Sequence, residues 1–221
     1  MAYYRRRLPH LQFNEGTYFI TFGLAGSLPT HAVDYLRQEK QRIKDSPKEE
    51  IDKSQKLYFK KYDHLLDSGS SPLWLGKHKV ANIVVNKINE LDNERYILLC
   101  YTIMPNHVHL LFKLTESRAK ARGTFDPASK YPVTHILKLL KGATAFKCNK
   151  LLNRSGSFWH HESYDRLVRN HQERDNIVRY ILENPVKAGL VSKYDEWNWS
   201  YCRNKALPSR SIVPRASAQD Q

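Results

Sequence analysis

Hydrophobic positions along the chain alternate between a period of two, typical of strands, and a period near 3.6, typical of helices. β-branched and aromatic residues dominate the segments with the shorter period. These segments predict strands at 16–22, 95–103, 107–113 and within 157–168. Apolar residues recurring three or four positions apart predict helices at 32–43, 79–93, 132–146 and 170–183. The last helix should break at Asn184, because the residue before Pro185 is pushed out of the helical region, and one more turn can start at Pro185 and end before Gly189.

Short strands separated by helices, with a hairpin in the middle, predict an α+β fold in which helices cover one face of an antiparallel sheet. We expect a single domain over residues 1–203, with a polar insertion or continued helix at about 44–72. The segment 115–130 reads as a basic loop, and the polar tail 204–221 as disordered.

The charge balance points to a polyanionic partner. Lysine and arginine number 36 against 22 acidic residues, which gives a net charge of +14 and a pI of about 9.7. The 13 Tyr, 8 Phe and 4 Trp suit unpaired bases better than a closed duplex, although most of them must serve the core.

The location expected from the sequence is the cytoplasm. Three widely spaced cysteines indicate reduced thiols rather than a disulfide framework. No apolar run approaches the ~20 residues that a membrane helix needs, and the basic N-terminus lacks the apolar region of a secretory signal.

The candidate chemistry begins in residues 101–112, YTIMPNHVHLLF. After the turn at Pro105, alternation places His107 and His109 on one face of a strand, roughly 7 Å apart along it. Two imidazoles on one side can converge on a divalent ion, while the opposite apolar face packs on helices. Two half-exposed histidines are the ordinary alternative, and spacing alone does not exclude it.

A second group of polar residues lies on the helix that ends near Pro185. Tyr180 and Asn184 are four residues apart and therefore share a face, with Asn176 one turn earlier. A tyrosine on the same edge as an oxygen donor can meet the two histidines across the sheet. A phosphate substrate would explain a phenol beside a metal.

The sequence MPNHVHLL, followed by a helix reading IVRYILENPVKAGLV, resembles the REP-associated tyrosine transposases, which are HUH single-strand nucleases. The segments RRLPH, TYFITFGLAGSLP and FWHHESYD, with the aromatic residues near Trp197, extend the resemblance over about Arg5 to Tyr201. The family's fold is ferredoxin-like, with an antiparallel sheet flanked by helices, which agrees with the α+β prediction.

The resemblance implies a single-stranded DNA endonuclease and strand transferase. By it, Tyr180 is the nucleophile that forms a 5′-phosphotyrosine, and His107 and His109 bind Mg²⁺ or Mn²⁺. Asn184 stands where relatives place a third, amide-type ligand, with Glu183 and His160 as the alternatives.

The family's target is a REP-type DNA hairpin, bound by a monomer or homodimer in the nucleoid. Basic side chains suited to DNA phosphates are Arg5, Arg6, Arg7, Lys138, Lys141 and Lys147. The lysines also fit a simple solvated helix face.

Three other functions remain open from the sequence. One is a catalytically idle hairpin-binding protein derived from such a transposase. Another is a replication or mobilisation initiator, which usually carries a second tyrosine or further domains. The third is a water-using metallohydrolase, which leaves no protein–DNA adduct.

Overall fold

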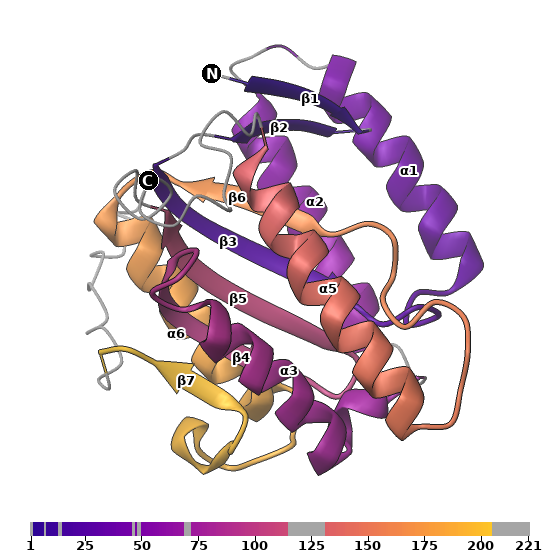
Figure 1. The fold of residues 1–221 in the computed structure, drawn as a ribbon. Helices are drawn as coiled ribbons and strands as arrows, with labels where there is room; N and C mark the ends of the chain where they lie inside the picture. The colour runs from indigo at the N-terminus through magenta and orange to yellow at the C-terminus, as the bar shows by residue number, and fades with distance from the viewer. Residues whose placement is uncertain are drawn as a thin grey trace, which may run out of the picture.

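The computed structural model describes residues 2–6, 8–12, 15–45, 47, 50–68, 72–114 and 131–204 (Figure 1). The basic loop expected at 115–130 and nearly all of the tail expected at 204–221 lie outside the described residues.

A five-stranded antiparallel sheet forms the centre of the molecule, with the strand order β6-β3-β5-β4-β7. The strands are β3 (Gly16–Gly23), β4 (Ile97–Ile103), β5 (His107–Leu114), β6 (Tyr164–Val168) and β7 (Ser200–Cys202). Helix α3 (His78–Leu91) connects β3 to β4, and α5 (Pro132–Leu151) connects β5 to β6. This βαββαβ order is ferredoxin-like, so the predicted α+β fold class is confirmed.

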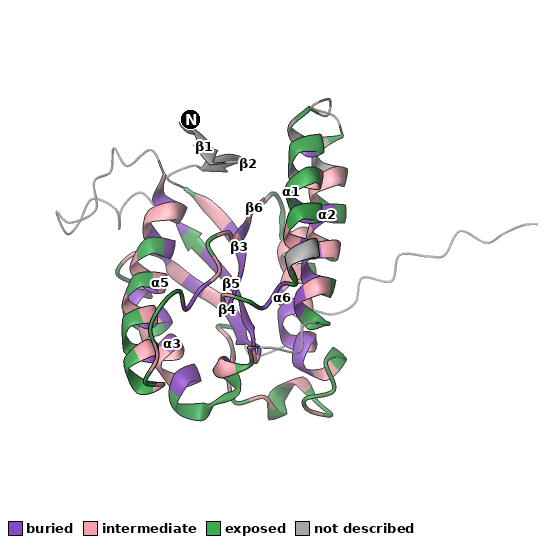
Figure 2. Ribbon diagram, turned by 90° about the vertical axis from the view of Figure 1, so that its right-hand side faces the viewer, coloured by how far each residue is buried: buried purple, intermediate pink, exposed green. Residues whose placement is uncertain are grey.

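Helices cover both faces of the sheet, so the expectation of one covered face is wrong (Figures 1 and 2). Helices α3 and α5 pack on the face that carries Val108, Leu110 and Phe112. The other face lies under α1 (Thr30–Asp45), α2 (Ile51–Asp67) and α6 (His171–Lys187). The reason is that Phe19 and Leu111 make this second face apolar as well, so it also has to be buried.

Most of the polar insertion expected at 44–72 is the helix α2. Its buried residues Tyr58, Tyr62 and Leu66 recur every four positions and pack into the core beneath α1 and α6. Charged residues between them hide this stripe in the sequence. The segment therefore contains a separate helix rather than a continuation of α1, which ends at Asp45, whereas α2 begins at Ile51.

Helix α6 begins as the sequence predicts and ends later. The side chain of Asn170 accepts a hydrogen bond from the backbone N–H of Glu173, at 2.8 Å, and caps the helix. The helix then continues through Pro185 to Lys187, so the predicted break at Asn184 is wrong. A proline close to a helix end forfeits a single hydrogen bond, a cost that packing of the buried Pro185 can offset.

The apolar repeat in α5 predicts a buried face made of Ile136, Leu139, Leu140, Ala143 and Phe146, and the structure differs from this prediction at Phe146. Ile136 and Leu140 are buried as expected, but Phe146 is 73% exposed. Thr144 and Cys148 face the core instead. The Thr144 hydroxyl, four residues after Leu140, donates to that residue's carbonyl and so satisfies its own polar group.

Outside the main sheet, β1 (Ala2–Arg6) and β2 (Leu8–Gln12) form an antiparallel hairpin. The basic N-terminus is therefore partly regular structure. Two 3₁₀ turns, Trp74–Gly76 and Tyr194–Glu196, complete the elements. Among the described helices, none has the length and apolar character to cross a membrane.

Candidate active site

Strand β5 and helix α6 bring together the tyrosine and the two histidines predicted from the sequence. The Nε2 atoms of His107 and His109 lie 3.0 Å apart. The Tyr180 hydroxyl lies 3.5 Å from His109 Nε2, and Asn184 Nδ2 lies 3.3 Å from the same atom. Both imidazoles are buried, at 1% and 0% exposure. They are therefore not the half-exposed pair that spacing alone allows.

Asp63 of α2 joins this group, and sequence reasoning missed it. Its Oδ1 lies 3.5 Å from His109 Nε2, and Asp67 Oδ1 lies 3.9 Å from His107 Nε2. Ligand-type atoms of Asp63, His107 and His109 all lie within 4.8 Å of one another. The one sequence signal was the four-residue spacing of Phe59 and Asp63, which puts the carboxylate beside an aromatic residue on an amphipathic helix.

Hydrogen-bond partners at the Nδ1 atoms fix the orientation of both imidazoles, whose Nε2 atoms face the ligand group. Asn106 donates its amide to the Leu66 carbonyl at 2.7 Å, which turns its Oδ1 toward His107 Nδ1, also at 2.7 Å. His107 must then carry its proton on Nδ1 and present an unprotonated Nε2. Thr21 Oγ1 lies 2.8 Å from His109 Nδ1 and can accept its proton in the same way. Such outer partners are typical of histidines that bind metals.

Burial keeps both histidines neutral, which is the form that binds a cation. It lowers the pKa of His107 to about 3 and lowers the pKa of His109 well below its ordinary value, helped there by the neighbouring His107. Two unprotonated Nε2 atoms that face each other at 3.0 Å repel unless a cation lies between them.

The residues present fit a divalent cation. Within the described chain, Asp63 Oδ1 and Asn184 Oδ1 are buried oxygens without a hydrogen-bond partner. Rotating the Asn184 amide would turn its oxygen, rather than its nitrogen, toward the histidines. Two ligands about 2.1 Å from an ion, at the right angle of an octahedral site, lie about 3.0 Å apart, which matches the two nitrogens.

The other two candidates for the third ligand lie elsewhere. Glu183 pairs with Lys187 at 3.3 Å along α6. His160 accepts a hydrogen bond from the Glu162 backbone through Nδ1 and lines a different cavity. Neither residue belongs to the ligand group found in the described chain.

Tyr180 is held as a neutral phenol. Its ring makes edge contacts with Phe19 and Phe59, at centroid distances of 6.0 and 5.6 Å. Its hydroxyl is hydrogen-bonded to Asp63. Burial, and then the negative charge of Asp63, raise the pKa of Tyr180 far above its ordinary value.

The basic residues expected to bind DNA are spread over other parts of the molecule. Lys138 and Lys147 are exposed on α5, across the sheet from Tyr180. Lys141 instead donates to the His160 carbonyl at 3.0 Å and holds that loop. Arg5 and Arg6 belong to β1, while Arg7 and all three side chains lie outside the described part of the chain.

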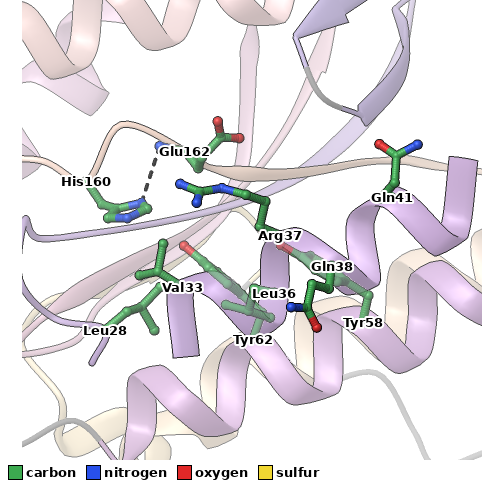
Figure 3. Close-up of a pocket in the computed structure, with 10 residues that line it drawn as sticks. All are labelled: Leu28, Val33, Leu36, Arg37, Gln38, Gln41, Tyr58, Tyr62, His160 and Glu162. Atoms are coloured by element: carbon green, nitrogen blue, oxygen red, sulfur yellow. Dashed lines mark hydrogen bonds between the residues drawn. The ribbon is translucent and has the colours of Figure 1, made fainter. Parts of the chain in front are cut away.

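Helix α2 separates two cavities. Its residues Lys56, Phe59 and Asp63 line a groove of about 880 Å³ that includes Tyr180. Tyr58 and Tyr62, on the opposite side of the helix, line a cavity of about 410 Å³ beneath α1 (Figure 3). The histidine pair lines neither cavity, but Asp63 and Tyr180 line the groove and not the smaller cavity, so the site adjoins the groove.

Fold and site thus describe an α+β protein in which a buried tyrosine meets a metal-type ligand group. No family model matches the sequence. A curated protein of Haemophilus influenzae, described as a "Putative REP-associated tyrosine transposase", is 29% identical over 99 residues. The match covers 44% of this chain and 54% of the relative, so it spans about half the length of that relative.

A solved structure agrees with this similarity at the level of the fold. It is described as "Structure of the REP associates tyrosine transposase bound to a REP hairpin". It matches with a TM-score of 0.50 and 17% identity, over 90% of this chain and 82% of that one. The resemblance to REP-associated tyrosine transposases that the two motifs indicate is confirmed.

Proposed function

We propose that this protein is a metal-dependent single-stranded DNA transesterase that binds REP-type hairpins and cleaves through Tyr180. The observation that carries the proposal is the position of the Tyr180 hydroxyl, 3.5 Å from a histidine nitrogen in a group of buried metal-type ligands. The hairpin-bound structure of similar fold and the curated transposase relative support the same class of substrate.

In this proposal His107, His109 and Asp63 hold Mg²⁺ or Mn²⁺, and Asn184 adds its amide oxygen. A bound divalent ion would polarise the scissile phosphate and offset the charge that develops on its oxygens. Tyr180 and the ligands belong to one chain, so a single copy contains the complete site. We therefore expect a monomer to be sufficient for cleavage in the cytoplasm.

Cleavage is a transesterification in which the Tyr180 oxygen bonds to phosphorus and the bond from phosphorus to the 3′-oxygen breaks. The phenolic proton leaves through the hydrogen bond to Asp63, and the departing 3′-oxygen takes up a proton. The products are a 5′-phosphotyrosine and a free 3′-hydroxyl. Attack by another 3′-hydroxyl reverses the step and joins strands without ATP, because the covalent link retains the phosphodiester energy.

The test is to incubate the protein with a labelled REP-type hairpin that carries a single-stranded flank, in the presence of Mn²⁺. We expect a covalent protein–DNA product on a denaturing gel. Tyr180→Phe should abolish it while leaving hairpin affinity within about twofold, because only the nucleophilic oxygen is removed.

His107→Ala should also abolish the adduct and the dependence of cleavage on Mn²⁺. An adduct formed by Tyr180→Phe would rule out this nucleophile. Cleavage without any adduct in the unmodified protein would favour the water-using hydrolase. Hairpin binding without cleavage would favour the idle binding protein.

A further inference from the structure

The groove that leads to Tyr180 extends well beyond the site itself. It runs between α2 and α6, with β6 along its other side, and has a volume of about 880 Å³. This volume lies within the range of about 300–1,000 Å³ that is typical of small-molecule pockets, and it is too small for a DNA duplex. Its inner end contains Asp63 and Tyr180. Whatever lies in the groove therefore adjoins the nucleophile.

An aromatic side chain is available for stacking inside the groove. Phe59 is half-buried, unlike the fully buried aromatic residues of the core. Its ring lies 4.7 Å from Tyr164 and 5.6 Å from Tyr180, so neighbouring rings hold it in place. A rigid, partly exposed ring next to the nucleophile suits an unpaired base, since every base has a face that stacks.

Basic residues line the same groove. Lys56 and Lys60 are exposed on α2, and Arg169 follows β6. The groove also contains acidic groups, but Glu173 is already paired with Arg166, at 2.5 Å, and Asp63 belongs to the ligand group. Asp67 remains as an acid near the inner end. The groove lining thus has four lysine or arginine residues against three acidic ones, and Lys56, Lys60 and Arg169 are exposed, which suits contact with a phosphodiester backbone.

We propose that this groove binds the single-stranded DNA adjoining the scissile phosphate. A base stacks on Phe59, and Lys60, Lys56 and Arg169 contact the flanking phosphates. The inference rests on the proposed function, because it specifies how the substrate strand reaches Tyr180. It assigns single-strand binding to α2 rather than to the lysines of α5.

The test measures binding of a labelled (dT)₈ strand and of a blunt eight-base-pair duplex by fluorescence anisotropy. All variants carry Tyr180→Phe, so no covalent product interferes. Phe59→Leu should weaken (dT)₈ binding about tenfold, the effect of losing one stacked base, while Phe59→Tyr retains the affinity. Duplex binding should not change with either variant.

Lys60→Gln provides a second test that does not disturb the core. It should reduce the slope of log affinity against log salt by about 0.7, the value for one lost contact with a single strand. Lys53→Gln is the matched control, because Lys53 is exposed on the same helix but does not line the groove. It should leave the slope unchanged.

The inference is overturned if Lys60→Gln and Lys53→Gln behave alike, or if Phe59→Leu weakens duplex and single strand equally. Neither measurement requires cleavage or hairpin recognition. Failure of the adduct assay with intact Tyr180, together with a selective loss of (dT)₈ binding, would contradict the proposed chemistry and leave the groove assignment standing.

Discussion

Buried titratable groups at the site give the protein two opposing dependences of stability on pH. Asp63 has its pKa raised to about 7, mainly by burial, so between about 4 and 7 the folded state holds a proton that the unfolded state releases. Its contribution to stability is present at low pH and is lost as the pH rises through 7. His107, with a pKa lowered to about 3, behaves oppositely: its contribution is present above about 6.5 and is lost as the pH falls. His109 acts in the same direction as His107.

Between pH 4.5 and 6 Asp63 therefore opposes the two histidines, and Asp67, whose pKa is also raised by burial, acts in the same direction as Asp63. We predict that Asp63→Asn, in metal-free protein, steepens the loss of stability on acidification by about one proton, or ~1.4 kcal/mol per pH unit. Urea unfolding at several pH values, with a chelator present, measures this slope. Asp34→Asn serves as the control, because that carboxylate is 60% exposed on α1. Identical slopes for the two variants would contradict the assignment.

Residue spacing made part of the site predictable and left part of it hidden. A period of two placed His107 and His109 on one face, and a four-residue interval joined Tyr180 to Asn184. Both are local rules that need no knowledge of the fold. Asp63 reaches the histidines from a helix more than forty residues upstream. Its role depends on how α2 docks on the sheet, and no local pattern encodes that docking.

Among the elements, α2 is the one that completes the site. The Leu66 carbonyl accepts the amide of Asn106, whose oxygen in turn orients His107. The Leu66 side chain is fully buried, within 3.0 Å of where a Cβ at Gly23 would lie. Leu66 follows Asp63 by three residues and therefore lies almost one turn further along the same helix. Packing at Leu66 thus fixes how far the carboxylate reaches toward the histidines.

Leu66→Ala should cost about 2–5 kcal/mol in the free energy of unfolding, because it leaves a cavity in the core. We predict that it also weakens Mn²⁺ binding at least tenfold, since α2 loses its anchor beside the ligands. Ile88→Ala is the matched control, because Ile88 belongs to α3 and is fully buried in the other core cluster. It should lower stability to a similar degree and leave Mn²⁺ affinity unchanged. Calorimetric titration of both variants decides the point, and equal losses of affinity would exclude this role for α2.

The predictions for the end of α6 and for the buried face of α5 were wrong for similar physical reasons. Helix α6 passes Pro185 because that residue is buried, and Phe146 faces solvent because Thr144 satisfies its own hydroxyl within α5. In each case tertiary packing, or a local hydrogen bond, outweighed the propensity on which the prediction relied. The strands of the sheet were predictable because their alternation is imposed by burial itself.

At the scale of the whole molecule, positive charge lies on both sides of the sheet. Lys138 and Lys147 are exposed on α5, while the groove and Tyr180 lie under the opposite layer. The chain passes from α5 through residues 152–163 into β6, the edge strand that also borders the groove. A hairpin duplex resting on α5 can therefore send its single-stranded flank around this edge to Tyr180. The α5 surface would then bind the duplex part of the substrate, and the groove on the other side of the sheet would bind its single strand.

This division predicts different effects for the two sets of lysines. The double variant Lys138→Gln/Lys147→Gln should reduce the salt slope of hairpin binding by about 1.8, because two contacts with duplex phosphates are lost. At saturating hairpin its rate of adduct formation should equal that of the unmodified protein, because neither lysine lies near Tyr180. Lys87→Gln on α3 should change neither quantity, since Lys87 is already paired with Glu90 at 2.6 Å. A double variant that slows adduct formation at saturation, with an unchanged slope, would show that α5 acts on the chemical step and not on the duplex.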